Sequence, residues 1–352
     1  MSGTATLTRT PTVTPASRST ALARPPRLTS LRWALVVATF AMACLTVSYA
    51  RELVVDFARS TATVGGFVLY AHSAAATLGW LLAAGALSLG YVAATEFGAP
   101  RAGRVGFVVS VLGAILLAGA GACAIWVTQV QDHASSSGGS LASTQATSIT
   151  NEVLELSKAE LAFQAAGFLV LAIAAFVAWS APRGGAAERG TARSSAAWHG
   201  MLLAVGVGFL VAAVAPAYTL AHVVWWASSP PNQLYVLMTT VPPVVAWLAI
   251  ALGLFCAGSA LRRSPRTTNL AIAGSIGGIG ACVLAVAYGT ELLYARLQLS
   301  DTHLGWFSNL AKTSSLTTWA GWLLLAAAFG VAATRLMERD VFVRPAATIA
   351  LA

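Results

Sequence analysis

The stretch Gly79-Trp80-Leu81-Leu82 decides the fold of this 352-residue chain, because similar stretches recur three times along it. The other three are Gly167-Phe168-Leu169-Val170, Ala246-Trp247-Leu248-Ala249 and Gly321-Trp322-Leu323-Leu324. Each copy lies in an apolar run long enough to cross a bilayer, and another such run precedes it. The chain is therefore predicted to form four helical hairpins.

Composition assigns the chain to the membrane proteins. Hydrophobic residues make up 57% of it and charged residues only 9%, whereas roughly a quarter of the residues of a soluble domain are charged. The net charge of +9 comes mainly from Arg in short segments between apolar runs, which is the pattern of topology signals rather than of nucleic-acid binding. We predict an all-α polytopic membrane protein whose partner is the lipid bilayer.

Eight apolar runs have the roughly 20 residues that a membrane-spanning helix needs. Residues 1–30 lack apolar periodicity and are predicted to be a disordered tail, and residues 337–352 form a second tail. The predicted spans are about 31–50, 66–94, 105–128, 160–180, 198–226, 235–261, 269–293 and 316–336.

The distribution of charge predicts the orientation of these spans. With the N-terminus inside, the inner segments hold sixteen basic and four acidic residues, and the outer segments hold five basic and eight acidic residues. Basic residues accumulate on the cytoplasmic side, so both termini are predicted to be cytoplasmic. Cleavage after Ser48-Tyr49-Ala50, as in a signal peptide, would leave seven spans and place Arg clusters outside. The Ala, Gly and Arg usage indicates the plasma membrane of a bacterium.

The repeated stretches also divide the chain into halves. Trp80 and Trp247 are 167 residues apart, so residues 31–180 and 198–336 are predicted to be two four-helix repeats joined by a cytoplasmic linker, 181–197. Since each half has an even number of spans, the halves are expected to be parallel and related by an axis along the membrane normal. We interpret the repeated aromatic residues as packing positions on the even helices.

Small residues mark the third and seventh spans. Gly113 and Gly121 lie in the third, and Gly274 and Gly278 in the seventh. Small residues at such spacing allow close approach between helices, so we expect these two spans to be the central helices of their halves.

Prolines distinguish the second half from the first. Pro216 lies in the fifth span, and Pro242 and Pro243 lie in the sixth; a proline inside a helix removes a backbone donor. The outer half of these two spans is therefore the predicted wall of any cavity, with Trp225, Trp226 and Tyr235 at its rim. The alternative for these three aromatic residues is an interfacial belt.

Ionisable residues inside the spans would indicate a path for ions or substrates. Apart from His72, the candidates lie near span ends and are Glu160, His199, His222 and Glu291. This distribution argues against a proton- or sodium-coupled transporter, which places a carboxylate near the middle of the bilayer.

Histidines suggest a second kind of site. His72, His133, His222 and His303 lie at or beyond the predicted outer ends of spans, one in each hairpin. Imidazole groups bind transition metals and the iron of haem, although none of these histidines has an i, i+3 or i, i+4 partner. The alternative function is therefore a redox or metal or haem enzyme with its site on the outer face.

No Walker sequence, H-E-x-x-H motif or serine-hydrolase motif is present. Our first hypothesis is a transport component, or a membrane subunit of a larger assembly, with no cofactor. Its substrate is not indicated, and we expect it not to be an enzyme.

Overall fold

The described part of the chain is helical throughout. A computed structural model describes residues 29–57, 66–96, 99, 101–136, 143–180, 189–225, 232–262, 268–299 and 307–349. The helical segments of this part are α1 (Thr29–Phe57), α2 (Gly66–Glu96), α3 (Arg101–Ser136), α4 (Ser143–Trp179), α5 (Arg189–Ala212), α6 (Val214–Trp225), α7 (Gln233–Arg262), α8 (Thr268–Leu299) and α9 (Phe307–Ile349). Most of the predicted tail and part of the predicted linker, residues 1–28 and 181–188, lie outside the described residues.

The prediction of eight membrane-length helices is confirmed. Eight stretches of 22 to 33 residues are long and apolar enough to cross a bilayer, and α5 and α6 together supply the fifth. At about 1.5 Å per residue, the shortest covers roughly 33 Å, against a hydrocarbon thickness of about 30 Å. These are the helices of a multi-pass membrane protein.

Many hydroxyl groups in these helices have backbone partners. Thr46 donates to the carbonyl of Met42 at 2.8 Å, and Thr219 donates to the carbonyl of Ala215 at 2.9 Å. A lipid environment offers polar groups no water, so these bonds within a helix lower the free-energy cost of placing Ser and Thr in a span.

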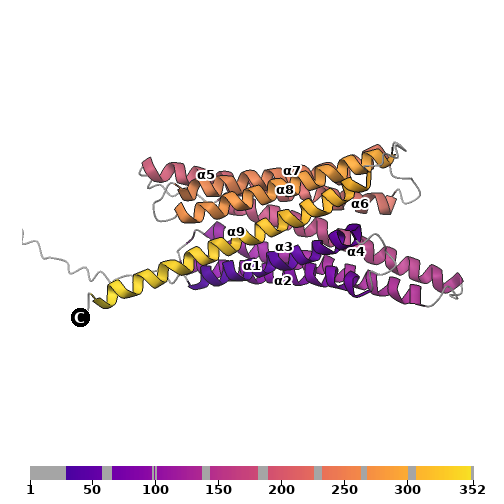
Figure 1. Cartoon of the computed structure of the whole chain (residues 1–352), viewed down its shortest axis with the longest axis horizontal. Helices are drawn as coiled ribbons and strands as arrows, with labels where there is room; N and C mark the ends of the chain where they lie inside the picture. The colour runs from indigo at the N-terminus through magenta and orange to yellow at the C-terminus, as the bar shows by residue number, and fades with distance from the viewer. Residues whose placement is uncertain are drawn as a thin grey trace, which may run out of the picture.

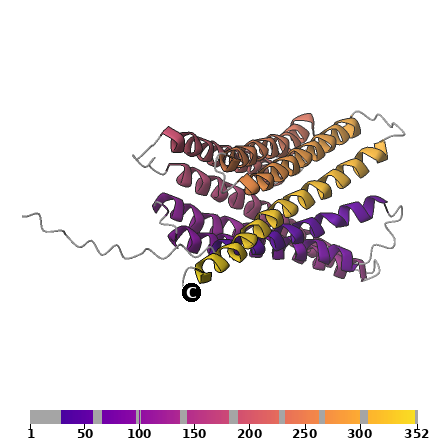
Figure 2. The ribbon, with the colours of Figure 1, turned by 60° about the vertical axis from the view of Figure 1, so that its left-hand side comes forward.

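The spans form a closed ring in the order of the sequence. Each span packs against the ones before and after it, and α9 returns to pack against α1. Figures 1 and 2 show α1–α4 as one group, α5–α8 as another, and α9 crossing from the second to the first. Every span of this ring has two neighbours; the seventh span, in α8, is the most buried of the eight, which fits its predicted central position, whereas the third span, in α3, is no more buried than the first or the fourth.

Contacts on two sides join α1–α4 to the other helices, among them a hydrogen bond and an aromatic stack. Arg32 of α1 donates through Nη2 to the carbonyl of Leu336 in α9 at 2.8 Å. On the other side of the ring, the rings of Phe168 in α4 and Phe209 in α5 stack with centroids 6.4 Å apart. The ring is thus closed by a polar contact on one side and an aromatic contact on the other.

In three of the four repeated stretches a glycine precedes the aromatic residue, and this glycine lies at a helix contact. A Cβ on Gly79 would lie 2.9 Å from Leu45 Cγ, one on Gly167 2.7 Å from Leu117 Cγ, and one on Gly321 2.6 Å from Leu284 Cγ. In each of these three hairpins the glycine therefore allows the second helix to approach the first closely.

The break between α5 and α6 has a local cause. Pro216 has no backbone N–H, and its ring would clash with the carbonyl four residues earlier, that of Ala212. Helix α5 ends at Ala212, and α6 begins at Val214. By contrast, α7 continues through Pro242 and Pro243.

Candidate functional site

A cavity of about 420 Å³ lies inside the ring and is lined by residues from all nine helical segments. Its size falls in the range of small-molecule sites, about 300–1,000 Å³. Helices far apart in the sequence meet around it: Tyr49 comes from α1, Tyr288 from α8 and Trp322 from α9. The walls are mainly apolar, with a few polar side chains among them, as in sites that bind small molecules.

The aromatic residues of all four repeated stretches line this cavity: Trp80, Phe168, Trp247 and Trp322. They lie well inside their helices; Trp80, for example, is 16 residues from the end of α2 at Glu96. The Trp247 and Trp322 rings meet edge to face, 5.3 Å apart. Packing is thus only part of their role, because they also form the cavity wall.

Polar residues lie on the same helix faces as these aromatic residues. His72, Glu160 and Thr239 each precede their aromatic residue by eight positions, and all three line the cavity. Residues eight apart lie about two helical turns apart on one face. The cavity therefore extends from the aromatic residues toward the N-terminal ends of α2, α4 and α7.

The fourth hairpin departs from this pattern. Ser314 precedes Trp322 by eight positions but donates to Glu291 Oε1 and to the carbonyl of Ala287, both at 3.2 Å. It lines a separate pocket of about 140 Å³ between α8 and α9. The hydroxyl group of Ser314 thus forms its hydrogen bonds between α8 and α9 and not in the central cavity.

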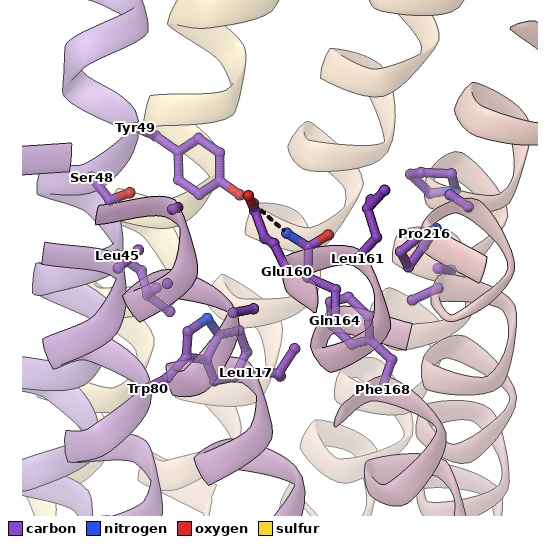
Figure 3. A pocket seen from close by; sticks show the side chains of 18 of the residues that line it. Leu45, Ser48, Tyr49, Trp80, Leu117, Glu160, Leu161, Gln164, Phe168 and Pro216 are labelled. Atoms are coloured by element: carbon purple, nitrogen blue, oxygen red, sulfur yellow. Dashed lines mark hydrogen bonds between the residues drawn. The ribbon is translucent and has the colours of Figure 1, made fainter. Parts of the chain in front are cut away.

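Glu160 is the carboxylate of the cavity. It is half-buried, and Gln164 one turn later donates through Nε2 to its Oε1 at 3.0 Å. Figure 3 shows the two side chains together in the cavity, with Trp80 and Phe168 also lining it. The sequence predicts Glu160 near the start of the fourth span; in α4 it follows the charged residues Glu152, Glu155 and Lys158 and lines the cavity.

His72 is held by α1. Its Nδ1 lies 2.6 Å from the carbonyl oxygen of Ser48 and 3.1 Å from the hydroxyl oxygen of the same residue. Because a carbonyl can only accept, the short contact fits a ring with the proton on Nδ1. The Tyr49 ring lies edge-on to His72, with centroids 6.3 Å apart.

Trp322 brings a buried donor to the cavity wall. The side chain is 6% exposed, and its Nε1 has no hydrogen-bond partner among the described residues. A buried N–H without an acceptor is costly. An acceptor oxygen of a bound molecule would remove that cost.

The residues predicted to line a cavity divide into two sets. Pro216 and Pro243 line the cavity, whereas Pro242 is buried in the packing around α7. Trp225 ends α6 and is 72% exposed. Tyr235 contacts the ring of His222, with centroids 4.6 Å apart. Trp226 lies outside the described residues.

Of the four histidines proposed as metal ligands, the structure describes the side chains of two. His72 lines the cavity, and His222 lies in α6 against Tyr235. The side chain of His133 and the whole of His303 lie outside the described residues. Within the part of the chain that is described, no group of three or more His, Cys, Asp or Glu residues could hold a metal ion. The metal or haem site stays a prediction.

Sequence reasoning identified Glu160 only as an ionisable residue near a span end, and it missed Gln164 and the cavity role of the repeated aromatic residues. The signal was present in the spacing, since aligning the four stretches places His72, Glu160, Thr239 and Ser314 at one position. Comparison with models of protein families, with curated proteins and with solved structures finds no match to this chain.

Proposed function

We propose that this protein is a transport component of a bacterial plasma membrane and that it binds a small molecule in its central cavity. The observation that carries the proposal is the position of the cavity, which all nine described helical segments line. A site of this kind lies between the moving parts of many transporters.

The packing around the cavity supports a transport role. On one side, Trp322 packs with Leu45, Leu284 and Leu325 in a buried cluster. The proposed transport requires the cavity to open, and we infer that it opens where α1 and α9 meet at this cluster. Motion of one group of helices relative to the other would provide this opening.

Filling the cavity tests this proposal. Ala76 and Ala74 lie two residues apart in α2, but Ala76 lines the cavity and Ala74 is exposed on the outside of the helix. We expect Ala76→Trp to abolish the retention of small molecules by protein purified from native membranes, as measured by mass spectrometry. It should also abolish uptake of those molecules into proteoliposomes.

Ala74→Trp is the matched control and should leave retention and uptake unchanged. Equal retention by the wild type and Ala76→Trp would contradict a cavity site. Wild-type protein that retains nothing, shows no uptake and co-purifies with other membrane proteins would instead support the hypothesis of a subunit of a larger assembly.

The proposed orientation places both termini in the cytoplasm, and cysteine labelling tests it. Replacing the four free cysteines by Ala gives the background for single cysteines at Glu155, whose side chain is 70% exposed, and at Arg101, which is exposed at the start of α3. In intact cells, we expect a membrane-impermeant maleimide to label Glu155→Cys. Arg101→Cys should react only after permeabilisation, and the reverse pattern would mean that the orientation is inverted.

A further inference from the structure

The charge of the central cavity is unbalanced. Glu160 is the one acidic residue among the described residues that line it, and no lysine or arginine is among them. Lys158, the basic residue nearest in sequence, instead contacts Glu155 with Nζ 2.6 Å from Oε1. A carboxylate in a partly desolvated site without a lysine or arginine beside it favours a cationic ligand, because burying an uncompensated charge is costly.

Aromatic side chains provide a second reason for a cation. Seven Trp, Tyr and Phe residues line the cavity: Tyr49, Trp80, Phe168, Phe209, Trp247, Tyr288 and Trp322. The face of an aromatic ring carries negative potential and attracts organic cations, most strongly where water is excluded. The carboxylate and the aromatic walls thus both favour a positively charged ligand.

The same walls select an organic cation over a metal ion. Calcium and magnesium need about six or more oxygen ligands, several of them carboxylates or water, whereas one carboxylate and mainly apolar walls suit a single positive charge on an apolar body. A volume of about 420 Å³ also exceeds what a bare ion fills.

We propose that the central cavity binds a monovalent organic cation of the ammonium type, with Glu160 as its counter-charge. Gln164 positions the carboxylate through its hydrogen bond of 3.0 Å, and the aromatic residues eight positions further along each helix surround the apolar part of the ligand. This inference rests on the proposed binding function of the cavity and adds the chemical class of the ligand.

Three probes of similar size and different charge test the inference. They are benzyltrimethylammonium, its neutral isostere neopentylbenzene, and the anion phenylmethanesulfonate. Binding is measured by equilibrium dialysis of the full chain in lipid nanodiscs, with empty nanodiscs subtracted. We expect the wild type to bind the cation at least about tenfold more tightly than the neutral isostere, and to bind the anion most weakly.

Glu160→Gln removes the charge and keeps an oxygen that accepts from Gln164. This variant should lose the preference for the cation while its affinity for the neutral isostere stays within about twofold. Glu155→Gln, an exposed carboxylate of the same helix, is the matched control and should bind like the wild type. If Glu160→Gln does not fold, Trp80→Leu serves as the second variant, and its affinity for the cation should fall about fivefold.

The outcomes separate this inference from the proposed function. Equal binding of the cation and the neutral isostere, or an unchanged preference in Glu160→Gln, would overturn the inference but leave a cavity that binds small molecules. Loss of binding of all three probes, together with equal retention of native molecules by the wild type and Ala76→Trp, would overturn both.

Discussion

Replacing Trp322 by Ala is expected to lower the free energy of unfolding by about 3 kcal/mol, the cost of removing a large buried side chain. Trp322 is 6% exposed. Its ring stacks on Tyr49 of α1 with centroids 5.4 Å apart and meets Trp247 of α7 edge to face. One side chain thus touches three helices of the ring, so its loss weakens the closure between α1 and α9.

The measurement is unfolding in mixed micelles, in which a denaturing detergent is titrated and helicity is followed. Trp225→Ala is the control, because Trp225 is 72% exposed and its replacement should change the unfolding free energy by less than about 0.5 kcal/mol. Equal effects of the two substitutions would mean that the aromatic cluster does not hold the ring closed. Trp322→Phe keeps most of the packing and removes the buried N–H, so it should cost less than Trp322→Ala.

The sequence was sufficient to predict the helices, since the length and hydropathy of a span are local properties. Eight spans follow from eight apolar runs, and the interruption of the fifth span follows from Pro216, whose ring excludes the carbonyl of Ala212 from a regular helix. Membrane helices are predictable to this degree because lipid leaves the backbone few alternatives.

The order of the helices in the ring could not be predicted in the same way. Small residues are present in most spans and allow close packing without selecting a partner. One of the contacts that close the ring joins Arg32 to the carbonyl of Leu336, 304 residues later, and nothing local to either residue indicates the other.

Glu160 shows why a residue that lines the cavity was not recognised as such from the sequence. The polar stretch before it includes Glu152, Glu155 and Lys158, so hydropathy alone starts the span at residue 160. In the structure, α4 is continuous from Ser143, and the carboxylate faces a cavity that other helices complete. A cavity is a property of the assembled ring, so no single span reveals it.

The repeated aromatic residues were noticed in the sequence, but their role in the cavity was not. Their recurrence was recognised, but they were interpreted as packing positions because each copy was considered within its own hairpin. Glycine and aromatic residue are neighbours on a helix and so face different directions, about 100° apart. Gly321 meets Leu284 in the hairpin contact, while Trp322 lines the cavity. One repeated dipeptide therefore serves both helix packing and the cavity wall.

Replacing Gly274 by Ala is expected to lower the free energy of unfolding by about 1–3 kcal/mol, the usual cost of overpacking a close contact. A Cβ on Gly274 of α8 would lie 2.8 Å from both Cα and N of Gly258 in α7, and 3.1 Å from the carbonyl oxygen of Leu254. These are backbone atoms, so no side chain can rotate to make room. The two helices have to move apart.

Gly289 is the matched control in the same helix, because a Cβ there would meet no atom within 4 Å. Gly289→Ala should leave stability unchanged or raise it by up to about 1 kcal/mol, since Ala favours the helix over Gly. The difference in unfolding free energy between the two variants, measured in the same detergent titration, separates the cost of the tight contact at Gly274 from the gain in helix propensity on replacing Gly by Ala. If both variants are equally stable, α7 and α8 do not pack as closely as Gly274 and Gly258 indicate.

The Gly274→Ala variant also tests whether helix packing affects ligand binding. Gly274 does not line the cavity, to which α8 contributes Tyr288 among the described residues. The folded fraction of Gly274→Ala should therefore keep the wild-type preference for benzyltrimethylammonium over neopentylbenzene. A loss of that preference would mean that the distance between α7 and α8 also sets the shape of the cavity.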